Sequence, residues 1–156
     1  METQKLTGYP SIDKPWLKYY SKEAIQTPLT EASVYEYLLE NNQKAEDLAR
    51  TALVYNNRKI SYKMLFDGIE RTARAFHHIG FVQGNTVACI APSFPETIYS
   101  FYAVNKLGGI SDYFDPRADI SDIRSELQEV RPIAMLIYED FMPKFQTMID
   151  ELHIPH

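Results

Sequence analysis

Residues 84–96 read GNTVACIAPSFPE, and this stretch decides the fold. Its first half, Thr86–Ala91, is a continuous apolar run bounded by turn-forming residues, which is typical of a strand covered on both faces in a parallel sheet. Ser93 and Glu96 have the spacing of a capping box, and Pro95 fits the first turn of a helix, where its missing N–H group costs little. We therefore expect a buried strand followed by a helix that Ser93 caps.

The sequence after this stretch alternates between helix and strand signals. The expected elements are a helix that reaches Leu107 and ends at Gly108-Gly109, the strand Ile110–Phe114, a helix that Asp119 caps and that runs to about Val130 before Pro132, the strand Ile133–Tyr138, and a helix over about Met142–Leu152. Alternation of this kind predicts an α/β fold with a parallel, doubly wound sheet.

The sequence before the stretch predicts a small hairpin between two helices. The expected elements are a helix from a Ser33–Glu36 capping box to about Asn41, the strands Thr51–Tyr55 and Arg58–Ile60 joined by an Asn56-Asn57 turn, and a helix that Ser61 caps and Gly80 ends. The second helix is supported by Leu65, Ile69 and Ala73, which recur at helical spacing. Asn-Asn suits a tight hairpin turn because asparagine tolerates the left-handed backbone region.

Residues 1–30 show no sustained period and contain three prolines. Trp16, Tyr19 and Tyr20 form one aromatic group there. Because aromatic side chains gain much free energy by burial, we expect an irregular arm that packs on the body of the protein, with one helical turn after Pro15. The chain should thus divide into an arm, residues 1–30, and a body, residues 31–156.

The bulk composition is that of a globular protein with an acidic balance. Hydrophobic residues make up 45% and charged residues 24% of the 156 residues, and the net charge is −5. A negative net charge argues against nucleic acid as the main partner, although one local arginine can still bind a small anion. Cys89 is the single cysteine, so no intrachain disulfide can form, and no apolar run is long enough for a signal peptide or a membrane span. We expect a cytoplasmic protein.

Most candidate catalytic and metal-binding residues have simpler explanations. Neither a GxxxxGK[ST] loop nor a GxGxxG motif is present. His77 and His78 diverge by about 100° on a helix and cannot easily share a metal ion, and His153 and His156 lie in the last four residues. The aspartates at positions 112, 115, 119 and 122 lack the glycine and glutamate of an EF-hand. We predict no metal site.

For two potential nucleophiles, a structural role is also favoured over a catalytic one. Cys89 lies in the middle of an apolar strand, where a buried, inert thiol is favoured over a reactive thiolate. Ser93 follows a strand and precedes a helix, but the glycines of a nucleophile elbow are absent around it. We therefore assign no catalytic residue in this chain.

The triplet Asp115-Pro116-Arg117 is the strongest binding candidate. It lies just past the carboxyl end of the predicted strand Ile110–Phe114, where open parallel sheets bind their ligands. An arginine there could pair with a phosphate group. On physical grounds alone, a phosphate contact and a solvated loop arginine explain Arg117 equally well.

The ordered series of segments resembles the N-terminal portion of the adenylate-forming (AMP-binding) superfamily. The segments that carry the resemblance are TALVY (51–55), ISY (60–62), GNTVA (84–88), APSFPE (91–96), NKLGG (105–109) and DPR (115–117). The leader DKPWLKYY (13–20) resembles the start of bacterial fatty-acid–CoA ligases. Members usually carry asparagine in place of Phe94 and an apolar run in place of Ser111-Asp112-Tyr113, so this chain departs from the pattern twice.

The resemblance implies a two-step reaction in a longer parent enzyme. A carboxylic acid, with fatty acids favoured, attacks ATP to give an acyl-adenylate, and the thiol of CoA then takes the acyl group. ATP, Mg²⁺ and CoA are thus implied for the parent. The family's catalytic loop and lysines lie downstream of the matched region, so we expect this chain alone to be inactive and to bind none of the three tightly. Arg117 corresponds to an arginine that contacts CoA phosphates in some ligases.

Three hypotheses follow. The first is the N-terminal fragment of an ATP-dependent acid–CoA ligase, cut where a further strand should begin, with residues 31–156 as the first part of its AMP-binding domain. The second is a non-catalytic module that binds CoA or a protein partner, and the third, ranked last, is a flavodoxin-like domain. Because a shortened sheet leaves an open edge, we also expect self-association.

Overall fold

A computed structural model describes residues 6–156, which divide into two compact units, one that ends at Glu31 and one that spans Ala32–His156. The first unit contains the short elements α1 (Pro10–Asp13), η1 (Pro15–Tyr19) and α2 (Lys22–Gln26). The helical turn predicted after Pro15 is present as η1, whereas α1 and α2 were not predicted. None of the three elements has a buried residue, and the expected packing of the arm on the body stays a prediction.

The centre of the second unit is a parallel sheet of three strands in the order β4-β3-β5. The strands are β3 (Thr86–Ile90), β4 (Ile110–Tyr113) and β5 (Ala134–Ile137). Every residue of β3 is buried, as the sequence predicts for a strand covered on both faces. β4 lies at the border of the sheet and its residues are exposed or half-buried. This edge position explains why β4 tolerates the polar residues Ser111 and Asp112.

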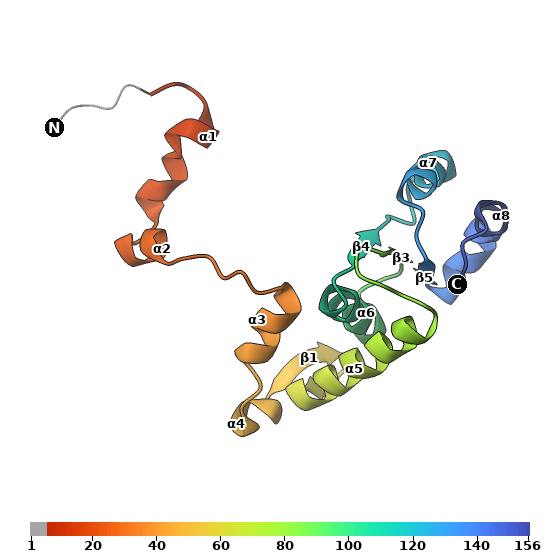
Figure 1. The fold of residues 1–156 in the computed structure, drawn as a ribbon, viewed down its shortest axis with the longest axis horizontal. Coiled ribbons are helices and arrows are strands. Elements are labelled where there is room, and N and C mark those ends of the chain that lie inside the picture. Colours follow the sequence, from red (N-terminus) through yellow and green to blue (C-terminus); the bar gives the residue numbers. More distant parts are fainter. Residues whose placement is uncertain (1–5) are drawn as a thin grey trace. The chain divides into compact units, whose positions relative to one another are not determined.

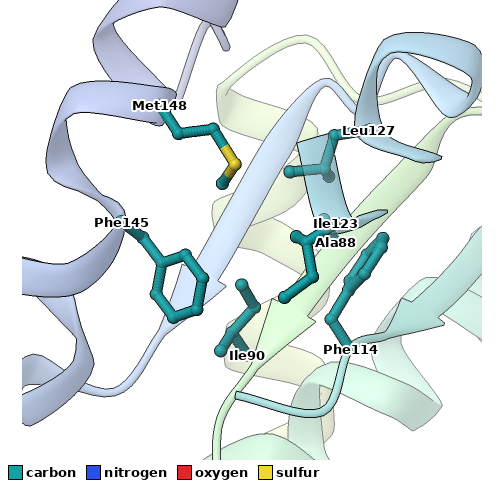
Figure 2. Packing of buried hydrophobic residues seen from close by; sticks show 7 residues of the cluster. All are labelled: Ala88, Ile90, Phe114, Ile123, Leu127, Phe145 and Met148. Atoms are coloured by element: carbon teal, nitrogen blue, oxygen red, sulfur yellow. The ribbon is translucent and has the colours of Figure 1, made fainter. Parts of the chain in front are cut away.

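Helices cover both faces of this sheet (Figure 1). α6 (Pro95–Lys106) packs on one face, where Val104 meets Val87 of β3. α7 (Ile120–Val130) and α8 (Met142–Leu152) pack on the other face. The cluster between them is drawn in Figure 2 and consists of Ala88, Ile90, Phe114, Ile123, Leu127, Phe145 and Met148. The predicted doubly wound α/β fold is confirmed.

A further layer packs against the outer side of α6. It contains α3 (Val34–Glu40), α4 (Ala45–Leu48), the antiparallel hairpin β1 (Thr51–Tyr55) and β2 (Arg58–Ser61), and α5 (Tyr62–His78). The Ser33–Glu36 capping box is formed as predicted. Asn56 and Asn57 both have positive φ, which is the conformation that the tight hairpin turn requires. α4 was not predicted, and it has no side-chain cap.

The predicted start of α6 is wrong by one residue. The helix begins at Pro95, its N-cap is Phe94, and no side chain caps it. Proline at the first helical position forces the preceding residue into an extended conformation, so the N-cap must be Phe94 and not Ser93. The Ser93–Glu96 capping box is therefore absent, and the hydroxyl of Thr97 donates instead to the carbonyl of Pro92 at 2.8 Å. Asp119 is the N-cap of α7, but its side chain makes no capping hydrogen bond.

Gly108 and Gly109 have the structural role that the sequence predicts. Gly108 follows the C-cap of α6 with φ of +71°, in the left-handed region that glycine adopts most easily. A Cβ atom on Gly109 would collide with the Phe81 ring and lie 2.8 Å from the carbonyl oxygen of Asn85. The pair thus ends the helix and lets the chain pass closely beneath Phe81 and into β4.

Candidate functional site at the carboxyl edge of the sheet

The carboxyl ends of the three strands form the candidate site. β3 and β5 are neighbours, yet the helices that follow them, α6 and α8, cover opposite faces of the sheet. Such a point is a topological switch, and in open α/β sheets ligands bind in the crevice outside it. Two cavities lie at this edge, and both are lined by Ala91, the residue that follows β3.

The first cavity has a volume of about 470 Å³ and lies where β3 and β4 end. Its lining includes Pro92, Phe114, Arg117 and Phe141. The side chain of Arg117 is 88% exposed at this cavity, so its guanidinium group is open to a ligand from solvent. Arg117 thus lies at the carboxyl edge of the sheet, as the sequence predicts.

Arg117 is held by Asp115, two residues before it. The guanidinium group donates from Nε to Oδ1 at 2.9 Å and from one Nη to Oδ2 at 2.6 Å, and the backbone N–H of Arg117 donates to Oδ1 at 2.9 Å. These hydrogen bonds lower the pKa of the Asp115 carboxyl to about 2. The aspartate is therefore charged at neutral pH and orients the arginine, while the remaining Nη is not bound to it.

Lys144 fixes the loop that carries this pair, and the sequence analysis missed it. Its ammonium group on α8 donates to the carbonyl oxygen of Pro116 and, at 3.2 Å, to that of Ala118. The position of Lys144 in the sequence is a signal for this contact. A cation in the first turn of a helix interacts unfavourably with the helix dipole, so a stabilising partner elsewhere is expected. The loop 115–118 is thus tied to the helix that follows β5.

An aromatic series crosses the same edge. Phe94 lies between Tyr55 and Tyr138, with ring centroids 5.7 Å and 5.0 Å away, and Tyr138 continues to Phe141 at 5.4 Å. All three pairs are edge-to-face, the arrangement that aromatic quadrupoles favour. Phe94 and Tyr138 also line the second cavity, of about 270 Å³, at the switch point between β3 and β5. Periodicity could not reveal this series, since its members come from three separate segments of the chain.

The other residues singled out in the sequence stay outside the two cavities or are buried. Cys89 is buried in β3, as predicted, and burial raises the pKa of its thiol to about 11. Ser93 neither caps α6 nor faces a base in any hydrogen bond of the described chain. His77 and His78 are the exposed last residues of α5. Across residues 6–156, no three His, Cys, Asp or Glu side chains gather closely enough to hold a metal ion.

The residues at this edge provide groups that can bind a ligand. Arg117 offers a cation oriented by a carboxylate, and the aromatic series offers apolar faces beside it. Of the residues that line the two cavities, none forms a nucleophile and base pair. In the part of the chain that the structure describes, no helix has both the length and the apolar character needed to cross a bilayer.

Comparison with known proteins gives a consistent family. The sequence model of the family described as AMP-binding enzyme matches residues 39–153. The chain is 23% identical over 132 residues to the long-chain-fatty-acid–CoA ligase of Bacillus subtilis, covering 84% of this chain and 23% of that protein. It is 33% identical over 123 residues to the crotonobetaine/carnitine–CoA ligase of Salmonella typhi, covering 72% of this chain and 24% of that protein.

A solved structure has the same fold over most of this chain. It is an anthranilate CoA ligase in complex with anthranoyl-AMP, with a TM-score of 0.71 and 20% sequence identity. The match covers 84% of this chain and 25% of that structure. The chain therefore spans about a quarter of the length of the proteins that it resembles.

Proposed function

Because the chain belongs to the AMP-binding enzyme family, we propose that it forms the N-terminal part of an ATP-dependent acid–CoA ligase. The observation that supports this most strongly is the ordered match over residues 39–153, together with relatives that are CoA ligases. The substrate of the parent is a carboxylic acid. A fatty acid is favoured by the leader DKPWLKYY and by the relative from Bacillus subtilis.

Within the parent enzyme, the residues of this chain would form part of the scaffold and would supply one contact to CoA. When bound, ATP with Mg²⁺ activates the acid and CoA supplies the thiol that accepts it. The role that we propose for Arg117 is to contact a CoA phosphate through its outward Nη group, while Asp115 and Lys144 hold the guanidinium group and its loop in place. Guanidinium suits this task because it stays charged and matches phosphate geometry.

The chain alone should not form acyl-adenylates. No residue at the carboxyl edge is arranged to stabilise a transferring phosphoryl group beyond the single arginine, and such a transition state needs several cations. An ATP–pyrophosphate exchange assay on the 156-residue chain should give the blank rate. Exchange clearly above the blank would show that the chain carries catalytic residues of its own.

Sequencing of the coding DNA beyond His156 tests the parent enzyme directly. The proposal expects an open reading frame that continues into a Ser/Thr/Gly-rich loop ending in lysine. A stop codon after His156 would favour the alternative, a non-catalytic module that binds CoA or a protein partner. For either function we place the protein in the cytoplasm, since its single cysteine suits a reducing compartment.

A CoA titration tests the role of Arg117. Wild type should bind CoA more tightly than Arg117→Ala, by about tenfold, which is the size expected for one charge-assisted contact. Arg124→Ala is the matched control, because Arg124 pairs with Glu151 and lines neither cavity. Equal affinity of wild type and Arg117→Ala, or binding by neither, would contradict the assignment.

A further inference from the structure

A third cavity, of about 480 Å³, shares no lining residue with the carboxyl edge. Three arginines line it: Arg58 at the start of β2, and Arg71 and Arg74 on α5. Tyr99 of α6 also lines it, and all three arginines are exposed. We call this cavity the arginine pocket. Three guanidinium groups around one cavity are notable in a chain whose net charge is −5.

Two carboxylates also line the arginine pocket, and both are already neutralised by lysines. Asp67 accepts a hydrogen bond from Lys63 at 2.7 Å, one helical turn away. Glu70 forms a salt bridge with Lys106 of α6 and also accepts a hydrogen bond from the Tyr35 hydroxyl at 3.2 Å. The negative charges in the lining are therefore paired with lysines, and Arg74 adds only the smallest of the electrostatic effects on Glu70.

The arginines themselves lack such partners. Over residues 6–156, the guanidinium groups of Arg58, Arg71 and Arg74 form neither a hydrogen bond nor a salt bridge. By contrast, the guanidinium groups of Arg50, Arg117 and Arg124 each bind a carboxylate. The positive charge of the arginine pocket is thus available to a ligand.

Tyr99 forms one tightly packed side of the arginine pocket. Tyr99 packs on Gly68 of α5 so closely that a Cβ atom on Gly68 would lie 3.0 Å from its ring carbons. A glycine inside a helix destabilises it by about 1 kcal/mol relative to alanine, so the close approach of Tyr99 gives Gly68 a reason. Burial raises the pKa of the Tyr99 phenol, which therefore carries its proton at neutral pH and can donate a hydrogen bond.

We propose that the arginine pocket binds a small anion that carries two or more linked phosphate groups. Arg71 and Arg74 are three residues apart on one helix face, where Cβ atoms are about 5–6 Å apart, so they can contact neighbouring phosphates. Arg58 reaches the same cavity from the hairpin, and each guanidinium group can bind two phosphate oxygens at once. The site goes beyond the proposed ligase function, which assigns no ligand to this face.

Calorimetric titration with inorganic tripolyphosphate at low ionic strength tests the proposal. Wild type should bind one equivalent, and orthophosphate should bind at least tenfold more weakly. Arg71→Gln and Arg74→Gln should each weaken tripolyphosphate binding about tenfold or more, as expected when a charge-assisted hydrogen bond is lost. Arg71→Lys keeps the charge but loses the fork, so it should also bind more weakly than wild type.

Two control variants remove the same charge elsewhere. Arg124→Gln and Arg131→Gln should leave the affinity within twofold of wild type, because neither residue lines the arginine pocket. Lack of saturable binding, or an equal loss in a control variant and in Arg71→Gln, would overturn the proposal. If the glutamine variants fail to fold by circular dichroism, Arg71→Lys decides: unchanged affinity would also overturn it. Arg117 is unchanged in every variant of this titration, so its outcome is separate from that of the CoA titration.

Discussion

Gly109 shows how one missing side chain fixes the path of the backbone. A Cβ atom there would collide with the Phe81 ring and lie 2.8 Å from the Asn85 carbonyl oxygen, and Asn85 also accepts the N–H of Ile110 at 2.9 Å. Gly109 thus lets the chain enter β4 in register with Thr86 of β3.

We predict that Gly109→Ala lowers the free energy of unfolding by about 1–3 kcal/mol, the usual range for overpacking a core. Urea denaturation followed by circular dichroism measures this loss. Adding Phe81→Leu should reduce the extra loss caused by Gly109→Ala, because a shorter side chain leaves room for the methyl group. Strictly additive effects of the two substitutions would contradict the predicted clash.

The Asp115–Arg117 pair makes a prediction about pH. The folded pKa of Asp115 is about 2, below its ordinary value of 3.8, because Arg117 donates to the carboxylate. The contribution of the pair to stability is therefore fully present above about pH 4 and is lost as the pH falls through about 2. Arg117→Gln should raise the Asp115 pKa towards 3.8, measured by NMR titration of the carboxyl carbon. Arg124→Gln should leave it unchanged, and an unaltered pKa in Arg117→Gln would exclude the pair in solution.

At the scale of elements, α3 is attached to α6 by an unusual cap. The backbone N–H of Tyr35 in the first turn of α3 donates to the Asn105 side chain of α6 at 2.8 Å, although the two residues are 70 positions apart. Lys106 strengthens the same junction, since its ammonium group pairs with Glu70 and lies 5.0 Å from the centroid of the Tyr35 ring. These contacts give a structural reason for the segment NKLGG.

We predict that Asn105→Ala destabilises the protein by about 1–2 kcal/mol, the typical effect of losing an N-cap. Hydrogen exchange should become faster in α3 and stay unchanged in α7 and α8, which belong to another core cluster. Ser33→Ala removes the local cap of the same helix and should accelerate exchange in α3 as well. Unchanged α3 exchange in Asn105→Ala would show that the long-range cap does not hold the helix.

Elements with strong periodicity were predictable from the sequence, and those without it were not. α8 has the predicted bounds, and β3 and the Asn56-Asn57 hairpin are present as expected. α1, α2 and α4 have at most five residues each, too few for a hydrophobic period to appear. The start of α6 differs from the prediction because Pro95 restricts Phe94 to an extended conformation, which outweighs the capping-box spacing of Ser93 and Glu96.

At the scale of the whole molecule, the open sheet is the feature with the clearest consequence. Among the described residues, β4 pairs only with β3, and its Ile110 and Tyr113 are 56% and 47% exposed. An exposed strand edge with apolar side chains is a template for pairing with another chain.

We therefore predict that the 156-residue protein self-associates through β4. Light scattering after size exclusion should show a mass that rises with concentration, and the melting temperature should rise with it. Ile110→Lys places a charge on the edge and should shift the protein towards the monomer, whereas Val82→Lys, an equally exposed apolar position outside the sheet, should not. A wild-type monomer at every concentration would contradict the prediction.

The candidate sites were predictable only where one segment carries them. Arg117 and Asp115 are near neighbours, and their place after a strand pointed to the carboxyl edge. The Lys144 contact, the aromatic series and the arginine pocket each depend on contacts between separate elements. Their geometry follows from tertiary packing, which cannot be read from a single sequence. Phe94 is informative in both respects: it departs from the family pattern in sequence, and in the structure it lines the cavity at the switch point together with Tyr138.

The division into two units also has an optical consequence. The single tryptophan, Trp16, lies in η1 of the first unit, whereas the second unit contains tyrosines and phenylalanines. Selective excitation of the indole therefore follows the surroundings of the first unit, while far-ultraviolet ellipticity is dominated by the helices of the second. The protein thus has two intrinsic spectroscopic signals, one for each unit, and needs no added fluorophore to compare their unfolding.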